Sequence, residues 1–140
     1  MRLILLSLFL TFLVVGCKDA SSAAATEAEN PIPEISVEDA DKALRSGAVA
    51  LDANSNRTRK KNGTLPSAVM LTSSSKYDLA QLPTDKSKDL IFYCSSTWCT
   101  ASDSAAERAS AHGYENVHIM REGIKGWKSA GKATQPFTDS

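Results

Sequence analysis

Residues 90–100 read LIFYCSSTWCT, and this stretch decides the fold. Its first four residues are apolar and of strand length, as expected for a strand buried on both faces of a sheet. A short polar loop follows. Residues 100–112 then show a helix pattern, with alanines at four-residue spacing and Gly113 at its end. The stretch predicts a strand, a loop and a helix, with Cys94 at the point where the strand ends.

The same alternation of strand and helix patterns extends to both sides of this stretch. Ser36, followed by an acid three residues later, has the sequence of a capping box, and Gly47 ends the helix that it predicts. Apolar runs of strand length lie at 48–53, 69–71 and 117–120, and a short helix pattern lies at 124–130. Residues 54–68 are polar and turn-rich, which favours a loop. The pattern predicts an α/β sandwich with a largely parallel sheet.

We interpret residues 1–16 as an export signal. One arginine precedes an apolar run at 3–15, which has the length of a signal-peptide hydrophobic region and is short for a membrane span. Residues 14–17 (VVGC) resemble the bacterial lipobox, in which the cysteine receives a diacylglycerol. The resemblance implies lipidation at Cys17 and a periplasm-facing protein of the cell envelope. Lys18 in the next position favours the outer membrane over the inner one.

A tether and one folded domain are expected after the signal. Residues 17–33 contain the cysteine to be lipidated and a polar stretch with one large apolar residue, Ile32, which is typical of a flexible tether. Residues 34–140 suffice for one small domain. The 16 basic and 16 acidic side chains balance, so the charge gives no argument for nucleic acid as a partner.

Four stretches of the chain together resemble the rhodanese-like domain family over roughly residues 34–133. They are Ile35-Ser36-Val37-Glu38, Leu51-Asp52, Gly63-Thr64-Leu65-Pro66-Ser67-Ala68 and Glu122-Gly123-Ile124-Lys125-Gly126-Trp127. The family's catalytic cysteine ends a strand of pattern (V/I)-(V/F)-Y-C, and residues 91–94 (IFYC) match it. The resemblance implies a rhodanese-like three-layer sandwich. It also implies a sulfurtransferase in which Cys94 takes sulfane sulfur from a thiosulfate-type donor and passes it to a thiol or to cyanide.

The position of Cys94 suits a reactive thiolate on physical grounds. The end of a parallel strand lies at the carboxyl edge of the sheet, where open α/β folds have their sites. Loop amides and the start of the following helix direct positive partial charge at the sulfur and stabilise its anion. The candidate substrate-binding residues are Ser95, Ser96, Thr97, Trp98 and Cys99, with Asp52 and Arg57 as supporting residues. An inert, buried Cys94 is the alternative.

The loop departs from the family pattern because it contains no basic residue. Active sulfurtransferases of the family often carry Arg or Lys here, whereas this loop has serines and a threonine, with Cys99 where a closing Arg is expected. Anion binding would then rest on amides and hydroxyls. The basic residues at 57 and 59–61 either replace the missing charge or form a solvated face.

Cys99 allows a second chemistry. Two nearby thiols in an oxidising compartment tend to pair. In one interpretation, Cys99 resolves a Cys94 persulfide, releasing sulfide and leaving a disulfide. In the other, Cys99 and Cys94 form a plain redox couple that exchanges electrons with a thiol-redox protein. A non-catalytic binding module is the third interpretation. No cofactor or metal is expected, because Cys-x₄-Cys spacing suits zinc poorly and His112 and His118 lie on separate elements.

The two tryptophans are predicted to occupy different environments. Trp98, between the cysteines, is expected to cover the loop as an apolar lid, with contact to a thiol partner as the alternative. Trp127 is expected to lie in the core, on the buried side of its short helix.

Overall fold

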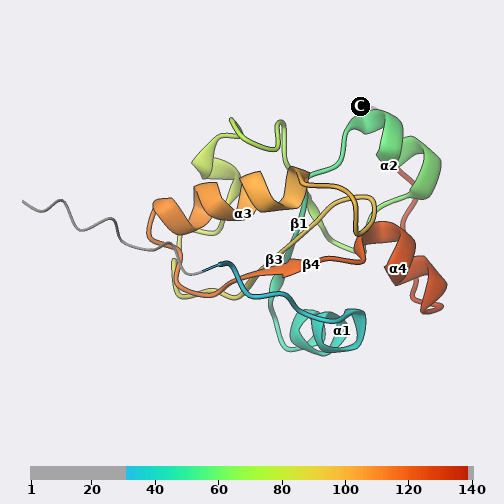
Figure 1. Cartoon of the computed structure of the whole chain (residues 1–140), viewed down its shortest axis with the longest axis horizontal. Coiled ribbons are helices and arrows are strands. Elements are labelled where there is room, and N and C mark those ends of the chain that lie inside the picture. The colour runs from blue at the N-terminus through green and yellow to red at the C-terminus, as the bar shows by residue number, and fades with distance from the viewer. Residues whose placement is uncertain (1–30, 139–140) are drawn as a thin grey trace, which may run out of the picture.

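The computed structural model describes residues 31–138, and in this part of the chain four parallel strands form one sheet (Figure 1). The strands β1 (Val49–Asp52), β2 (Val69–Met70), β3 (Leu90–Tyr93) and β4 (Val117–Met120) lie in the order β2-β1-β3-β4. The predicted α/β architecture with a parallel sheet is confirmed. The predicted signal and Cys17 lie outside the described residues. Within residues 31–138, no helix is long and apolar enough to cross a bilayer.

Helices cover both faces of the sheet, as the three-layer prediction required. The helices are α1 (Val37–Arg45), α2 (Asn56–Asn62), α3 (Ala101–Ala111) and α4 (Gly123–Ser129), and one 3-10 turn, η1, spans Leu79–Gln81. Figure 1 shows α3 on one side of the sheet and α1 on the other. The capping prediction at Ser36 is confirmed, because its hydroxyl accepts a hydrogen bond from the Asp39 amide.

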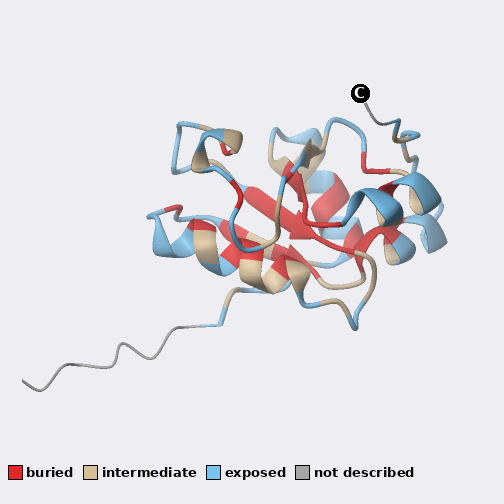
Figure 2. Ribbon diagram, turned by 90° about the horizontal axis from the view of Figure 1, so that it is seen from above, coloured by how far each residue is buried: buried red, intermediate tan, exposed pale blue. Residues whose placement is uncertain are grey.

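The strands are buried on both faces, and alternate side chains enter two separate cores. Leu90 and Phe92 pack on the α3 side, whereas Ile91 and Tyr93 pack on the side of α1 and α4. Figure 2 shows the buried residues concentrated in the central strands. The small residues of α3 allow its close approach to the sheet, since Ala105, Ala106 and Ala109 have no exposed surface.

The prediction of a loop over residues 54–68 is wrong for the first half of this segment, which forms α2. The Ser55 hydroxyl accepts a hydrogen bond from the Thr58 amide, and Gly63 ends the helix with a positive φ of 77°. The helix sequence, NRTRKKN, has no apolar stripe, so hydrophobic periodicity could not reveal it. Its buried side chain is the charged Arg59.

Arg59 forms a buried ion pair with Asp52, the last residue of β1. Arg59 is 4% exposed and Asp52 is fully buried. The Arg59 Nε lies 3.4 Å from Asp52 Oδ1, and its Nη2 donates to the carbonyl oxygens of Asp52 (2.8 Å) and Leu71 (2.9 Å). The guanidinium therefore joins α2 to the ends of both β1 and β2.

The Asp52 carboxylate also fixes the end of β3. It accepts hydrogen bonds from the Tyr93 hydroxyl (2.7 Å) and from the Asn54 amide (2.7 Å). Burial and the neighbouring Asp52 charge raise the pKa of Tyr93 far above its ordinary value, so the phenol stays protonated and donates. The same hydroxyl accepts from the Leu65 amide at 3.1 Å. Asp52 thus holds the residue that immediately precedes Cys94.

Removal of the Arg59 guanidinium should strongly destabilise the fold. Arg59→Ala leaves the Asp52 carboxylate buried without its cation, so the free energy of unfolding should fall by about 3–5 kcal/mol. Arg57→Ala, at an exposed position of the same helix, should change it by no more than about 0.5 kcal/mol. Urea denaturation measures both. Equal, small effects would contradict the structural role given to the ion pair.

Candidate functional site

Cys94 lies at the carboxyl end of β3, where the strand order reverses. The chain runs from β1 to β2 on one side and then continues to β3 on the other side of β1. Such a reversal separates the loops that follow the two strands and leaves room for a site between them. The predicted placement of Cys94 at the end of a strand and before a helix is confirmed by the bounds of β3 and α3.

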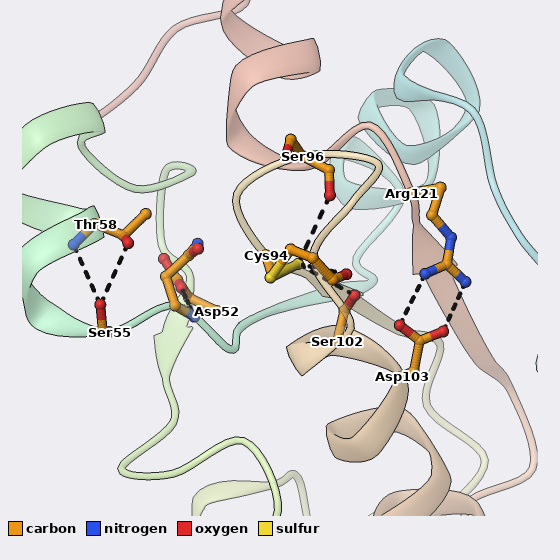
Figure 3. Close-up of a disulfide and its surroundings, with 10 residues drawn as sticks. Asp52, Ser55, Thr58, Cys94, Ser96, Ser102, Asp103 and Arg121 are labelled. Carbon is orange, nitrogen blue, oxygen red and sulfur yellow. Dashed lines mark hydrogen bonds and ion pairs between the residues drawn. A yellow bond between two sulfur atoms is a disulfide. The ribbon is translucent and has the colours of Figure 1, made fainter.

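Cys94 and Cys99 are joined by a disulfide, with their Cα atoms 6.2 Å apart (Figure 3). The intervening loop closes through a hydrogen bond from the Cys99 amide to the Ser96 carbonyl oxygen (3.0 Å). Of the two cysteines, Cys94 is 1% exposed and Cys99 is partly exposed. The structure therefore shows the pair in its oxidised, closed form.

Polar atoms surround the buried Sγ of Cys94. The Cys99 carbonyl oxygen lies 3.1 Å away, the Ser96 carbonyl oxygen 4.0 Å away, and the Ser102 Oγ 3.5 Å away. Figure 3 shows Ser102 and Ser96 on either side of this sulfur. Ser102 is buried in the first turn of α3, where its hydroxyl can donate to the sulfur. Sequence reasoning missed Ser102, because no motif distinguishes it from the other serines of the loop and helix.

The start of α4 holds the backbone of the loop. The Ile124 amide donates to the Cys94 carbonyl oxygen (2.9 Å), and the Lys125 amide donates to that of Ser95 (3.1 Å). Gly123, with φ +62°, permits this approach, because a Cβ there would lie 2.5 Å from the Cys94 carbonyl oxygen. These two amides of α4 are therefore committed to the loop. By contrast, no backbone hydrogen bond within residues 31–138 uses the amides of residues 95–98 as donors.

Arg121 fixes the beginning of α3 from the end of β4. Its Nη1 and Nη2 donate to the two carboxylate oxygens of Asp103 (2.8 and 2.7 Å), and its Nε donates to Glu34 (2.8 Å), as Figure 3 shows for Asp103. The hydrogen bonds from Arg121 hold the pKa of Asp103 below its usual value. The partners lie far apart in the chain, so no sequence pattern predicts this contact.

A basic cleft of about 220 Å³ lies beside the loop, between α2 and α4. Its lining residues are Arg57, Thr58, Lys61, Asn62, Ser95 and Lys125. Arg57, predicted as a supporting residue, is therefore brought next to the loop together with Lys61. Arg59 is not, because its charge is buried against Asp52. Lys125 comes from the other end of the chain, and sequence reasoning missed it.

A larger cleft of about 520 Å³ opens at the same edge of the sheet, between the segments that follow β1 and β2. It is lined by residues of 53–59 and 70–74 and by none of residues 94–99. Because it does not reach the cysteine loop, this cleft is not the site of cysteine chemistry, although it is the larger of the two. Among residues 31–138, no group of three or more His, Cys, Asp and Glu side chains is arranged to hold a metal ion.

The expectation that Trp98 covers the loop is wrong, because Trp98 is 93% exposed. The turn between Ser96 and Cys99 places Thr97 and Trp98 at the outer tip of the loop, with the cysteines drawn together below them. Ser95 and Ser96 are partly buried. Trp127 is buried, as predicted, and its indole N–H donates to the Ala133 carbonyl oxygen (2.8 Å).

Comparison with known proteins identifies a family for most of the described residues. The family model named Rhodanese-like domain matches residues 36–130. A search of curated proteins finds no match.

Solved structures share the fold at low sequence identity. A protein from Bacillus halodurans is 19% identical with a TM-score of 0.63, covering 74% of this chain and 76% of its own. The rhodanese-like domain of an Anabaena protein is 22% identical with a TM-score of 0.61, covering 75% and 80%. A Rhodopseudomonas palustris protein of unknown function, called a possible tyrosine phosphatase, is 20% identical with a TM-score of 0.61, covering 74% and 85%. These similarities show the fold alone.

Substitution of Gly123 should disturb the cysteine loop more than substitution of a glycine with similar backbone geometry. Gly131→Ala adds a Cβ at φ +71° into open space, so it should cost about 1–2 kcal/mol of stability through backbone strain alone. Gly123→Ala adds the same strain and a clash with the Cys94 carbonyl oxygen, so it should cost about 1–3 kcal/mol more. Urea denaturation compares them, and equal losses would show that α4 does not position the loop.

Proposed function

The chain belongs to the rhodanese-like domain family, and we propose that it is a sulfurtransferase with Cys94 as its nucleophile. The observation that carries the proposal is the position of Cys94 at the end of β3, followed by a loop whose amides at residues 95–98 have no backbone acceptor. These amides can stabilise the negative charge of a thiolate, a persulfide or a bound oxyanion.

The proposed reaction begins with the reduced protein. The Cys94 thiolate attacks the outer, sulfane sulfur of thiosulfate, the S–S bond of the donor breaks, and sulfite leaves with the bonding electron pair. Cys94 then carries a persulfide. A cyanide ion or an external thiolate attacks its outer sulfur, and the Cys94 thiolate is released. Each step forms one bond to sulfur and breaks one, so no other oxidant or reductant is needed.

The basic cleft supplies a positive surface for the anionic donor. Arg57, Lys61 and Lys125 line it together with Ser95, the residue that follows Cys94. Their charges attract an anion to the loop, although the loop itself contains no Arg or Lys. This supports a small sulfur-containing anion as the donor.

A redox role for the Cys94–Cys99 pair is the second candidate function, and the disulfide is the observation that favours it. In the sulfurtransferase scheme, the Cys99 thiolate attacks the Sγ of a Cys94 persulfide, expels hydrosulfide and forms this disulfide. In a plain redox couple the same disulfide exchanges electrons with thiols and carries no sulfane sulfur.

Two serine variants separate these functions. Cys94→Ser should abolish formation of thiocyanate from thiosulfate and cyanide, because a hydroxyl cannot form a persulfide. Cys99→Ser should retain the transfer and prolong the life of the Cys94 persulfide, because no second thiol can expel its outer sulfur. Thiocyanate colorimetry and intact-protein mass measure the two effects. Full transfer by Cys94→Ser would exclude the proposed nucleophile, and no transfer by any form of the protein would favour the redox couple.

Loss of the Lys125 charge should weaken binding of the donor without changing the nucleophile. Lys125→Gln should raise the KM for thiosulfate by about twofold to fivefold, the effect of one exposed charge, and leave kcat nearly unchanged. Lys128→Gln is the matched control, since Lys128 is exposed on the same helix and does not line the cleft. Equal KM values for the two variants would remove the cleft from the proposed donor site.

We also propose that Cys17 anchors the domain to the periplasmic face of a bacterial envelope membrane, with the outer membrane favoured. The support is the VVGC sequence that ends the apolar run. In a bacterium that processes lipoproteins, Cys17→Ala should prevent incorporation of labelled fatty acid into the full chain. Equal labelling of the wild type and Cys17→Ala would contradict the anchor.

A further inference from the structure

The two cysteines of the disulfide differ in exposure. Cys94 is 1% exposed, and it belongs to the apolar core between the sheet and α3. Cys99 is partly exposed and packs against that core from outside it. A thiol that opens a disulfide must reach the sulfur that it attacks. In the closed form, Cys99 is therefore the more accessible of the two cysteines.

A hydrogen-bond donor beside the Cys94 sulfur favours the same direction of attack. The carbonyl oxygens of Cys99 and Ser96 lie 3.1 and 4.0 Å from the Cys94 Sγ, and they oppose an incoming and a leaving thiolate there alike, so they give no preference. A thiolate that leaves from Cys94 keeps the Ser102 hydroxyl as a hydrogen-bond donor, 3.5 Å away, at the start of the 11-residue helix α3. Exchange is faster when the leaving thiolate is the better stabilised one.

We infer that the Cys94–Cys99 disulfide is opened at Cys99, with Cys94 as the leaving group, by a dithiol protein that contacts Trp98. The inference rests on the proposed function only in taking the disulfide to be an oxidised state that must be reduced before Cys94 can act. It assigns Cys99 the role of receiving electrons and Trp98 the role of a docking residue.

The electron balance needs one dithiol. A thiolate of the reductant attacks the Cys99 Sγ, the Cys94–Cys99 bond breaks, and Cys94 leaves as a thiolate. The second thiolate of the reductant then attacks the reductant's own sulfur in the mixed disulfide, and Cys99 leaves as a thiolate that takes a proton from water. The reductant loses two electrons and becomes a disulfide, and both cysteines of this chain become reduced.

Trp98 argues for a protein as the reductant. It is 93% exposed and adjoins the attacked residue, whereas among residues 31–138 the other exposed large apolar side chain is Met70, at 42%. An exposed indole beside a reactive disulfide provides apolar contact area and an N–H donor, the properties of an anchoring residue in protein interfaces. A small thiol would gain little from such a surface.

The direction of attack can be read from one tryptic peptide. The oxidised full chain is treated briefly with reduced glutathione and quenched with excess N-ethylmaleimide, which alkylates free thiols rapidly near neutral pH, and the peptide 89–108, which contains Cys94 and Cys99 and no other cysteine, is sequenced by mass spectrometry. We expect glutathione on Cys99 and the alkyl group on Cys94. Glutathione on Cys94 would overturn the inference. Neither result depends on sulfur transfer, so the proposed function can fail independently.

The docking role is tested with reduced thioredoxin as the protein dithiol and glutathione as the small thiol. Trp98→Ala should slow reduction by thioredoxin by about fivefold and leave reduction by glutathione unchanged. Thr97→Ala, at the neighbouring exposed position of the loop tip, is the control and should slow neither. Unchanged reduction of Trp98→Ala by thioredoxin, or equal slowing with both reductants, would overturn the assignment of Trp98.

Discussion

The site depends on one buried carboxylate. Asp52 ends β1, and three groups meet on it: the Arg59 guanidinium, the Tyr93 hydroxyl and the Asn54 amide. A buried carboxylate is tolerated only when cations and donors of this kind satisfy it, so its partners must keep their places. Through Arg59 it holds α2 against the ends of β1 and β2, and Arg57 of the same helix lines the cleft beside the cysteine loop. Through Tyr93 it fixes the end of β3, one residue before Cys94.

The loop after β3 is held from a second side by α4. Two α4 amides bind the carbonyl oxygens of residues 94 and 95, and Gly123 permits the close backbone approach. Loop amides that do not bind other backbone groups remain for an anion, and the basic cleft lies next to them. The disulfide then sets the state of the site. While Cys94 is bonded to Cys99 it cannot accept sulfur, so the disulfide must be reduced before sulfur transfer.

Patterns within single segments of the sequence predict most of the fold and the position of Cys94. The apolar run before Cys94 and the small residues of α3 predict the strand–loop–helix unit that the structure contains. Predictions failed where a residue's position depends on a charged contact or on a contact between residues far apart in the sequence. The helix α2 has a buried Arg59 in place of an apolar stripe, and Lys125 reaches the loop from 30 residues further along the chain. Trp98 was expected to be covered because it is apolar, but the turn that brings the cysteines together directs it to solvent.

Whether Cys94 accepts sulfane sulfur can be decided from the mass of a single peptide. The full chain carrying Cys99→Ser would be reduced, freed of reductant, treated with thiosulfate, and digested without further thiol, so that peptide 89–108 retains any adduct. We expect a gain of about 32 Da, one sulfur atom, on Cys94, and its loss on addition of cyanide. If Cys94 remains an unmodified thiol at saturating thiosulfate, it is not the acceptor of sulfane sulfur.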